Sequence, residues 1–105
     1  MNNGEGAYGA VQAAQDASGA RVVRLIGEID LSNADALGDT LAAITGEGHH
    51  LVIDLSALEF MDSSGLAMLL RAAGRASSVE VRNPSAVVRR IIECTGLADV
   101  LHIES

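Results

Sequence analysis

The spacing of hydrophobic residues changes along this chain, and each spacing predicts a different kind of element. Short runs rich in β-branched residues occur at Arg21–Ile26, Leu51–Leu55 and Val79–Val81 and predict strands. The run Leu51–Leu55 is nearly continuous, which is typical of a strand covered on both faces. We also expect a short edge strand at Val11–Gln15, and a last helical turn or strand at Val100–Ile103.

Three other segments repeat their hydrophobic residues at helical intervals and predict amphipathic helices. The repeating positions are Ala34, Leu37, Leu41 and Ile44; then Leu66, Leu69, Leu70 and Ala73; then Val87, Val88, Ile91 and Ile92. Ser32 and Asp35 have the spacing of a capping box at the first helix, which Gly46 and Gly48 should stop. Asn83-Pro84-Ser85 should open the third helix, with Pro84 at its start, and Gly96 should end it.

The order of these elements predicts an α/β fold. Strands come first and then alternate with helices, which favours a small mixed β-sheet of four to five strands with helices packed against it. The chain has 105 residues and shows no internal repeat or linker, so we expect a single domain over residues 11–105. Residues 1–10 are rich in Gly and Asn without periodicity and predict a flexible N-terminus.

Composition and charge narrow the range of partners. The formal net charge of −7 argues against a nucleic-acid or anionic-membrane surface, because both need clustered Lys and Arg. An acidic surface suits a partner with a basic docking face, although it also serves solubility alone. No hydrophobic stretch reaches the roughly 20 residues of a membrane span, and no signal peptide is present, so we expect a cytoplasmic protein.

The residues that common enzymes require do not form recognisable patterns here. The adjacent His49 and His50 are predicted to lie in a loop and cannot make a helical i, i+4 zinc pair. The single cysteine, Cys94, fits the third helix as a small, half-buried hydrophobic residue. The G-x-S-x-G pattern of a nucleophile elbow and the glycine-rich phosphate loops are missing. The sequence therefore predicts a protein that is not an enzyme, with no metal or cofactor of its own.

The segment Phe60-Met61-Asp62-Ser63-Ser64-Gly65-Leu66 precedes the second predicted helix. Asp62 or Ser63 at the N-cap would stabilise that helix by about 1 kcal/mol, which explains one polar side chain but not two hydroxyls and a glycine. Gly65 is a poor helix former and is understandable where something approaches the backbone closely. Either the hydroxyls only cap the helix, or one of them is chemically modified.

Four segments together resemble the signature of STAS-domain proteins, specifically bacterial anti-sigma factor antagonists. They are Asp54-Leu55-Ser56-x-Leu58-x-Phe60 continuing to Leu66, Gly27-Glu28-Ile29-Asp30, Asn83-Pro84-Ser85-x-Val87-x-Arg89, and Thr95-Gly96-Leu97. They occur in the family's order and span about residues 21–103. The turn between the second helix and Val79 is shorter than the family often has.

The resemblance implies a phosphorylation-controlled partner switch. The first serine of Asp-Ser-Ser-Gly, here Ser63, would be phosphorylated by an anti-sigma factor with serine kinase activity, and a phosphatase would reset the phosphoserine. The unphosphorylated protein would bind the anti-sigma factor and release a sigma factor. Ser64 is the second choice of phosphoacceptor. The residues expected to contact the partner are Asp30, Ser32, Asp62, Ser63, Ser64, Gly65 and Leu66, whereas Asp54 is expected to cap a loop.

Other members of the family serve other assemblies. The same domain is a non-catalytic subunit of lipid-transport complexes, where the motif tends to be Asp-Thr-Gly-Gly, and a component of stress-signalling assemblies with additional segments. The intact Asp62-Ser63-Ser64-Gly65 favours the partner switch. That prediction requires the Ser63 hydroxyl to be exposed.

Overall fold

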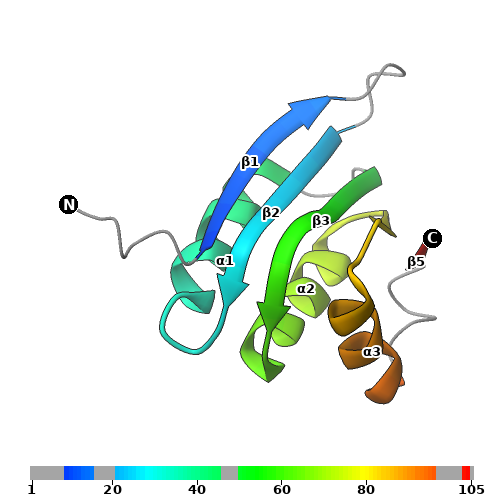
Figure 1. Cartoon of the computed structure of the whole chain (residues 1–105). Helices are drawn as coiled ribbons and strands as arrows, with labels where there is room; N and C mark the ends of the chain where they lie inside the picture. Colours follow the sequence, from blue (N-terminus) through cyan, green and yellow to red (C-terminus); the bar gives the residue numbers. More distant parts are fainter. Residues whose placement is uncertain (1–8, 16–20, 46–49, 97–102, 105) are drawn as a thin grey trace.

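The computed structural model describes residues 9–15, 21–45, 50–96 and 103–104 (Figure 1). The elements run in the order β1 (Gly9–Gln15), β2 (Arg21–Ile29), α1 (Ala34–Thr45), β3 (His50–Met61), α2 (Ser63–Arg75), β4 (Ser78–Arg82), α3 (Ala86–Cys94) and β5 (Ile103–Glu104). The α/β class and the mixed sheet predicted from the sequence are confirmed.

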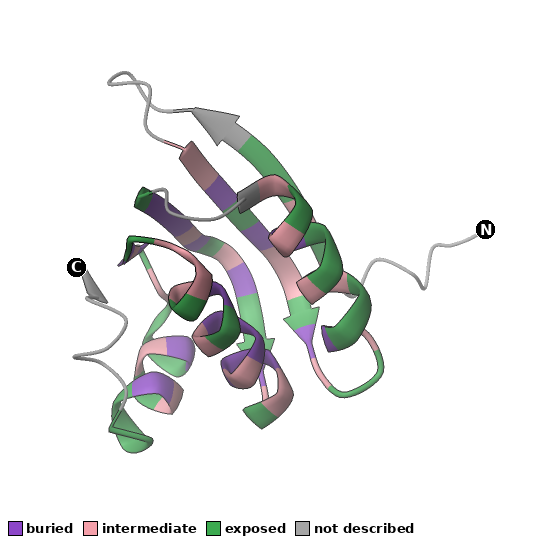
Figure 2. Cartoon of the chain, turned by 180° about the vertical axis from the view of Figure 1, so that it is seen from behind, coloured by how far each residue is buried: buried purple, intermediate pink, exposed green. Residues whose placement is uncertain are grey.

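The five strands form one sheet whose spatial order equals their order in the chain. β1 pairs with β2 in antiparallel orientation, and all later pairs are parallel. Each helix therefore crosses from one parallel strand to the next in the same direction across the sheet. Right-handed crossovers in one direction place their helices on one face, and Figure 2 shows all three helices in front of the sheet when it is seen from that side.

The core lies between this helical layer and the inward face of the sheet. Aliphatic side chains fill it, as the scarcity of aromatic residues requires. Its fully buried members include Val23, Leu25, Leu51, Ile53, Leu55, Leu58 and Met61 from the sheet and Leu41, Leu69, Ala72, Val88 and Ile92 from the helices. The predicted apolar faces of the helices thus supply much of this core. Their packing on the sheet fixes the positions of the strand ends at the surface.

Four strands, β1 to β4, are longer than predicted. β3 continues to Met61 rather than ending at Leu55, because β2 pairs with it throughout, as far as Ile29 and Met61. Register shifts between Arg24 and Ile26 and after Gly27 accommodate the polar residues that interrupt the apolar pattern of β3. β1 begins at Gly9 rather than Val11, since its ladder with β2 extends to Gly27.

Two predicted helix starts are wrong. α1 begins at Ala34, and the Ser32 hydroxyl donates to Asp30 rather than capping the helix, so the capping box with Asp35 does not form. At α3 the N-cap is Ser85, and Pro84 lies outside the helix. The C-terminal prediction at Gly96 agrees with its φ of 78°, a left-handed value that glycine adopts without strain. Gly46, Gly48 and most of Val100–Ile103 lie outside the described residues.

Candidate functional site

The ends of β2 and β3 leave the sheet side by side and bring two acidic residues together. Ile29 pairs with Met61, and the Asp62 N–H donates to the Ile29 carbonyl at 3.1 Å. Asp30 and Asp62, which directly follow these paired residues, therefore start two adjacent surface segments. The sequence predicts each residue at a strand end, but only the parallel pairing makes them neighbours.

Asp62 caps helix α2. Its carboxylate oxygen Oδ1 accepts hydrogen bonds from the backbone N–H groups of Ser64 at 2.8 Å and Gly65 at 3.4 Å. Its backbone is extended, with φ −101° and ψ −166°, as an N-cap residue requires. Of the two cap candidates from the sequence, the structure assigns Asp62 and leaves Ser63 as the first residue of the helix.

The two serines of the motif lie in different surroundings. Ser63 is exposed, and its side chain makes no hydrogen bond within the described part of the chain. Ser64 is half-buried and gives its backbone N–H to Asp62. The condition that the sequence argument placed on Ser63, an accessible hydroxyl, is met. Ser64 is less accessible, since the first turn of the helix turns it partly inward.

Gly65 and Leu66 lie beneath this surface rather than on it. A Cβ on Gly65 would stand 2.8 Å from the Met61 Cβ, closer than real contacts allow, and 3.1 Å from the Ile29 Cγ2, which is a tight contact. Glycine thus lets α2 pack directly on the ends of β2 and β3, and the close approach inferred from the sequence comes from the protein's own core. Leu66 is 6% exposed and belongs to the core cluster. We therefore assign these two residues a role in positioning the helix, and their contact with a partner stays a prediction.

The loop from β2 to α1 forms the second wall of the site. Oδ1 of Asp30 accepts both the backbone N–H of Ser32 at 2.9 Å and its hydroxyl at 2.5 Å. These hydrogen bonds, with the Ser32 hydroxyl first, hold the pKa of Asp30 below its ordinary value of 3.8. The turn leaves Leu31 82% exposed. Ser32 thus orders the Asp30 carboxylate, and the exposed leucine between them was missed by sequence reasoning.

Within the described residues, the turn at Asp62 occurs three times, each time in an Asp-x-Ser sequence. Oδ1 of Asp30, Asp54 and Asp62 accepts the N–H of the serine two residues later at 2.8–2.9 Å. This Asx turn is a known preference of aspartate, so the repeated spacing in the sequence could have revealed it. The predicted loop-capping role of Asp54 fits this bond, although the bond lies within β3.

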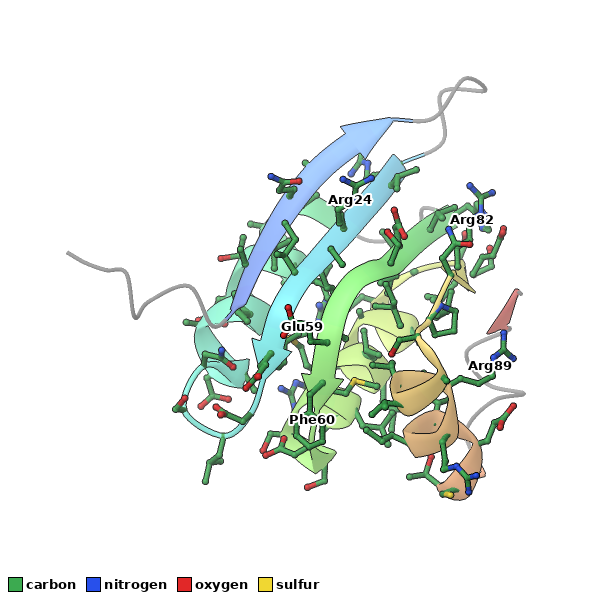
Figure 3. The ribbon with its side chains drawn as sticks, in the orientation of Figure 1. Arg24, Glu59, Phe60, Arg82 and Arg89 are labelled. Atoms are coloured by element: carbon green, nitrogen blue, oxygen red, sulfur yellow. The ribbon has the colours of Figure 1, made fainter. Side chains whose placement is uncertain are left out.

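Asp54 also pairs across the sheet with Arg24, at 3.3 Å between Nε and Oδ2. Partial burial opposes ionisation of this carboxyl, but the hydrogen bonds from Ser56 and the nearby guanidinium outweigh it and lower its pKa below 3.8. Figure 3 shows Arg24 and Arg82 toward the opposite end of the strands from Phe60. This structural ion pair is therefore remote from Ser63.

The catalytic groups sought in the sequence do not assemble at Ser63. His50 is the first residue of β3 rather than part of a loop, and there its Nδ1 lies 2.5 Å from the Ser78 hydroxyl while its Nε2 lies 3.7 Å from Glu80. The other carboxylate oxygen of Glu80 accepts a hydrogen bond from Arg82 Nε at 2.7 Å. His50 and Ser78 are the first residues of β3 and β4, whereas Ser63 follows the end of β3. Across the described residues, no cluster of metal-ligating side chains is found.

Cys94 contradicts its prediction as a half-buried residue, because it is exposed on α3. It lies off the helix face that buries Val88 and Ile92. None of the described helices is long and apolar enough to span a bilayer.

The charges around Ser63 are acidic and uncompensated. None of the ion pairs within the described residues involves Asp30 or Asp62. The N-terminus of α2 supplies positive potential next to Ser63, from its dipole and its first N–H groups. Such a site offers an accessible hydroxyl at a helix end that tolerates an anion, in a surface that otherwise repels one.

Comparisons with known proteins agree with this architecture. A family model described as "Mlab, STAS domain" matches residues 13–103. The anti-sigma-B factor antagonist of Bacillus subtilis is 30% identical over 87 residues, which cover 79% of this chain and 80% of that protein. The chain belongs to the STAS-domain family of anti-sigma factor antagonists.

Two further members of the family are similar. The anti-sigma-F factor antagonist RsfB of Mycobacterium tuberculosis is 37% identical over 86 residues, which cover 78% of this chain and 70% of that protein. The crystal structure of an anti-sigma factor antagonist from Mycobacterium paratuberculosis superimposes with a TM-score of 0.77 at 32% identity, covering 90% of this chain and 85% of that one. The resemblance read from the four sequence segments is therefore confirmed at the level of the family.

Proposed function

We propose that this STAS domain is an anti-sigma factor antagonist that works as a phosphorylation-controlled partner switch in the cytoplasm. Unphosphorylated, it binds an anti-sigma factor and so releases a sigma factor. That anti-sigma factor is also the serine kinase that phosphorylates Ser63, and a phosphatase removes the phosphate. The domain itself is a regulatory protein and carries out no catalysis.

The proposal rests on the different roles of Asp62 and Ser63 at the start of α2. The carboxylate of Asp62 supplies the helix cap, so the fold does not need the hydroxyl of Ser63. That hydroxyl is exposed and has no hydrogen-bond partner within the described residues. A kinase can therefore reach it, and its modification leaves the hydrogen bonds of the helix start in place.

Phosphorylation would change the charge of the site far more than its shape. A phosphoserine carries about −1.5 to −2 charges at neutral pH. The N-terminus of α2 stabilises that anion within the domain. To a partner fitted against a neutral hydroxyl, however, it adds a dianion beside Asp62 and the neighbouring loop of Asp30. A hundredfold loss of affinity requires only about 2.7 kcal/mol, which one desolvated, unpaired charge readily supplies.

Surface residues around the hydroxyl make up the proposed contact with the anti-sigma factor. Asp30, Ser32, Asp62 and Ser64 belong to it, and Leu31, with 82% of its surface exposed, is its apolar anchor. Buried anchors ringed by polar contacts provide most of the binding energy in protein interfaces. The carboxylates suit a basic surface on the partner, in line with the net charge of −7.

The test uses the purified histidine-kinase-like anti-sigma factor from the same organism, with ATP. Wild-type protein is expected to bind it and to take up phosphate. Ser63→Ala should bind with unchanged affinity and take up none, and Ser63→Asp should bind at least about 100-fold more weakly. Thr40→Asp is the matched control, because it adds the same charge at an exposed position on α1.

Two results would contradict the proposal. Phosphate found by mass spectrometry on Ser63→Ala would move the acceptor to another residue, and loss of phosphate uptake in Ser64→Ala alone would identify Ser64. Equal affinity of Ser63→Asp and wild type would show that charge at this position does not control binding.

A further inference from the structure

A second surface on the same end of the domain has the character of a binding groove. It lies between the tip of β3 and one side of α3, has a volume of about 600 Å³, and is almost wholly apolar. Its lining residues are Phe60, Ala86, Val87, Arg90, Ile91, Cys94 and Thr95. Among the described residues the large hydrophobic side chains that remain exposed are Leu31, Phe60 and Val87, and two of these three line the groove.

The pairing of the strands explains why this surface is open. β4 pairs with β3 only between His50 and Asp54, whereas β3 continues to Met61. Beyond Asp54, α3 lies beside the second half of β3 (Figure 1). α3 turns Val88 and Ile92 into the core, and this leaves its adjacent side facing outward next to Phe60. The groove is thus built from rigid elements.

The groove carries a positive charge, whereas the chain as a whole is acidic. Arg90 is the only ionisable group with a permanent charge in the lining, and it makes no ion pair within the described residues. Its neighbour Arg89 differs, because it pairs with Glu93 at 3.7 Å and points away from β3 in Figure 3. A chain with a net charge of −7 therefore presents, at the edge of an apolar surface, one guanidinium that has no ion-pair partner among the described residues. An occupant that complements it needs apolar side chains and a carboxylate.

The dimensions of the groove favour a helix as that occupant. The lining residues of α3 follow the i, i+4, i+8 spacing of a single helix face and extend over roughly 13 Å. A second helix can pack along such a face at 8–10 Å between axes, with Phe60 closing one side. A small apolar molecule would stay largely in water here, because the groove is bounded by only one helix and one strand tip.

We propose that this groove binds an amphipathic helix of the anti-sigma factor, with an acidic residue of that helix opposite Arg90. The inference rests on the proposed function. The groove lies close to the phosphorylation site along the chain, because Phe60, which lines the groove, is near the end of β3 and Asp62 follows that strand directly. Two contacts then act together: the Ser63 surface responds to phosphate, and the groove supplies affinity that does not depend on it.

Affinity for the purified anti-sigma factor tests this proposal. Val87→Asp and Arg90→Glu should each weaken binding at least about tenfold, since truncation or reversal of a buried anchor has this effect. Aspartate near the start of α3 favours the helix, so Val87→Asp should not unfold it. Thr40→Asp and Arg71→Glu, exposed positions on α1 and α2, are the matched controls and should bind like wild type. All four variants must still be phosphorylated on Ser63 at high kinase concentration.

The single cysteine offers an independent measurement on unmodified protein. Cys94 lines the groove and is exposed, so its alkylation by iodoacetamide, followed by mass spectrometry, should slow at least about tenfold in the complex. If the wild type binds, Val87→Asp binds with the same affinity and the complex does not slow alkylation of Cys94, the proposed role of the groove is wrong. The phosphorylation switch would survive that result. Absence of binding and phosphorylation in the wild type would overturn both. Self-association of the wild type that Val87→Asp abolishes, without a change in affinity, would assign the groove to a second copy of the chain.

Discussion

Helices α2 and α3 begin in similar ways, yet their serines play different parts. Each helix follows a strand, and a polar side chain caps each one. At α3 the cap is Ser85, whose hydroxyl accepts the N–H of Val88 at 3.1 Å. At α2 the cap is the carboxylate of Asp62, and Ser63 occupies the next position with its hydroxyl exposed.

The difference separates structural serines from available ones. A hydroxyl at the N-cap is already bonded to the backbone, and modifying it would remove that bond. A hydroxyl one residue later does not make this capping hydrogen bond. It still lies within the positive end of the helix dipole, which stabilises a phosphate. Position within the first turn, rather than exposure alone, makes Ser63 suitable for a reversible modification.

The largest expected effect comes from Gly65, which sets how closely the start of α2 packs on the sheet. Gly65→Ala should destabilise the domain by about 1–3 kcal/mol, because its Cβ would overlap Met61 and Ile29. Gly74→Ala in the same helix meets no atom within 4 Å and should stabilise by up to about 1 kcal/mol. Urea unfolding of both variants measures the contrast. A stabilised Gly65→Ala would show that the packing at the start of α2 tolerates a methyl group.

The two N-cap residues, Asp62 and Ser85, should contribute equally to stability but unequally to the rate of Ser63 phosphorylation. Asp62→Ala and Ser85→Ala should each reduce stability by about 1 kcal/mol, since each removes one cap. Only Asp62→Ala should slow phosphorylation of Ser63, because only it loosens the turn that presents the hydroxyl. Thermal unfolding and the initial rate of phosphate incorporation check both parts. Equal phosphorylation rates in the two variants would remove the positioning role of Asp62.

A smaller, pH-dependent effect is expected from Asp54, which makes the same Asx turn inside β3. Its pKa is lower in the folded state than its ordinary value of 3.8, so the folded protein binds fewer protons and is stabilised by the ionised form. This contribution is complete well above pH 4 and disappears as pH falls through the folded pKa. Asp54→Asn should therefore be less stable than wild type at pH 7, by at most about 1 kcal/mol for a partly exposed pair. The difference should shrink as the pH falls below 3.8 and vanish once the carboxyl is protonated in the folded protein too, as urea unfolding across pH can determine.

The smallest expected effect is that of Ser63→Ala on stability. Because Ser63 makes no side-chain hydrogen bond within the described residues, its replacement should change the free energy of unfolding by less than about 0.5 kcal/mol. Ser85→Ala, measured under the same conditions, provides the scale. A loss comparable to that of Ser85→Ala would mean that the hydroxyl of Ser63 supports the helix start after all.

The sequence predicted the fold class and the motif well, because both depend on local pattern. Helical and extended periodicities expose the elements, and an Asp-Ser-Ser-Gly segment before an apolar helical stripe marks a capped helix start. The sequence pattern predicted the ends of the strands and helices less well. β3 extends through Asp54, Ser56 and Glu59 because β2 pairs with it over its whole length, and a pairing partner distant in the chain leaves no local signal.

By itself, the sequence determined that a serine-containing helix start follows a buried strand, since capping and amphipathic spacing act between neighbours in the chain. Only the tertiary structure decided which polar residue would cap that helix and which would stay free. It also decided that Gly65 and Leu66 lie inside, that Asp30 borders the site, and that Phe60 meets α3 in a groove. These outcomes depend on how strands and helices pack against one another, and packing is a property of surfaces brought together by the whole fold.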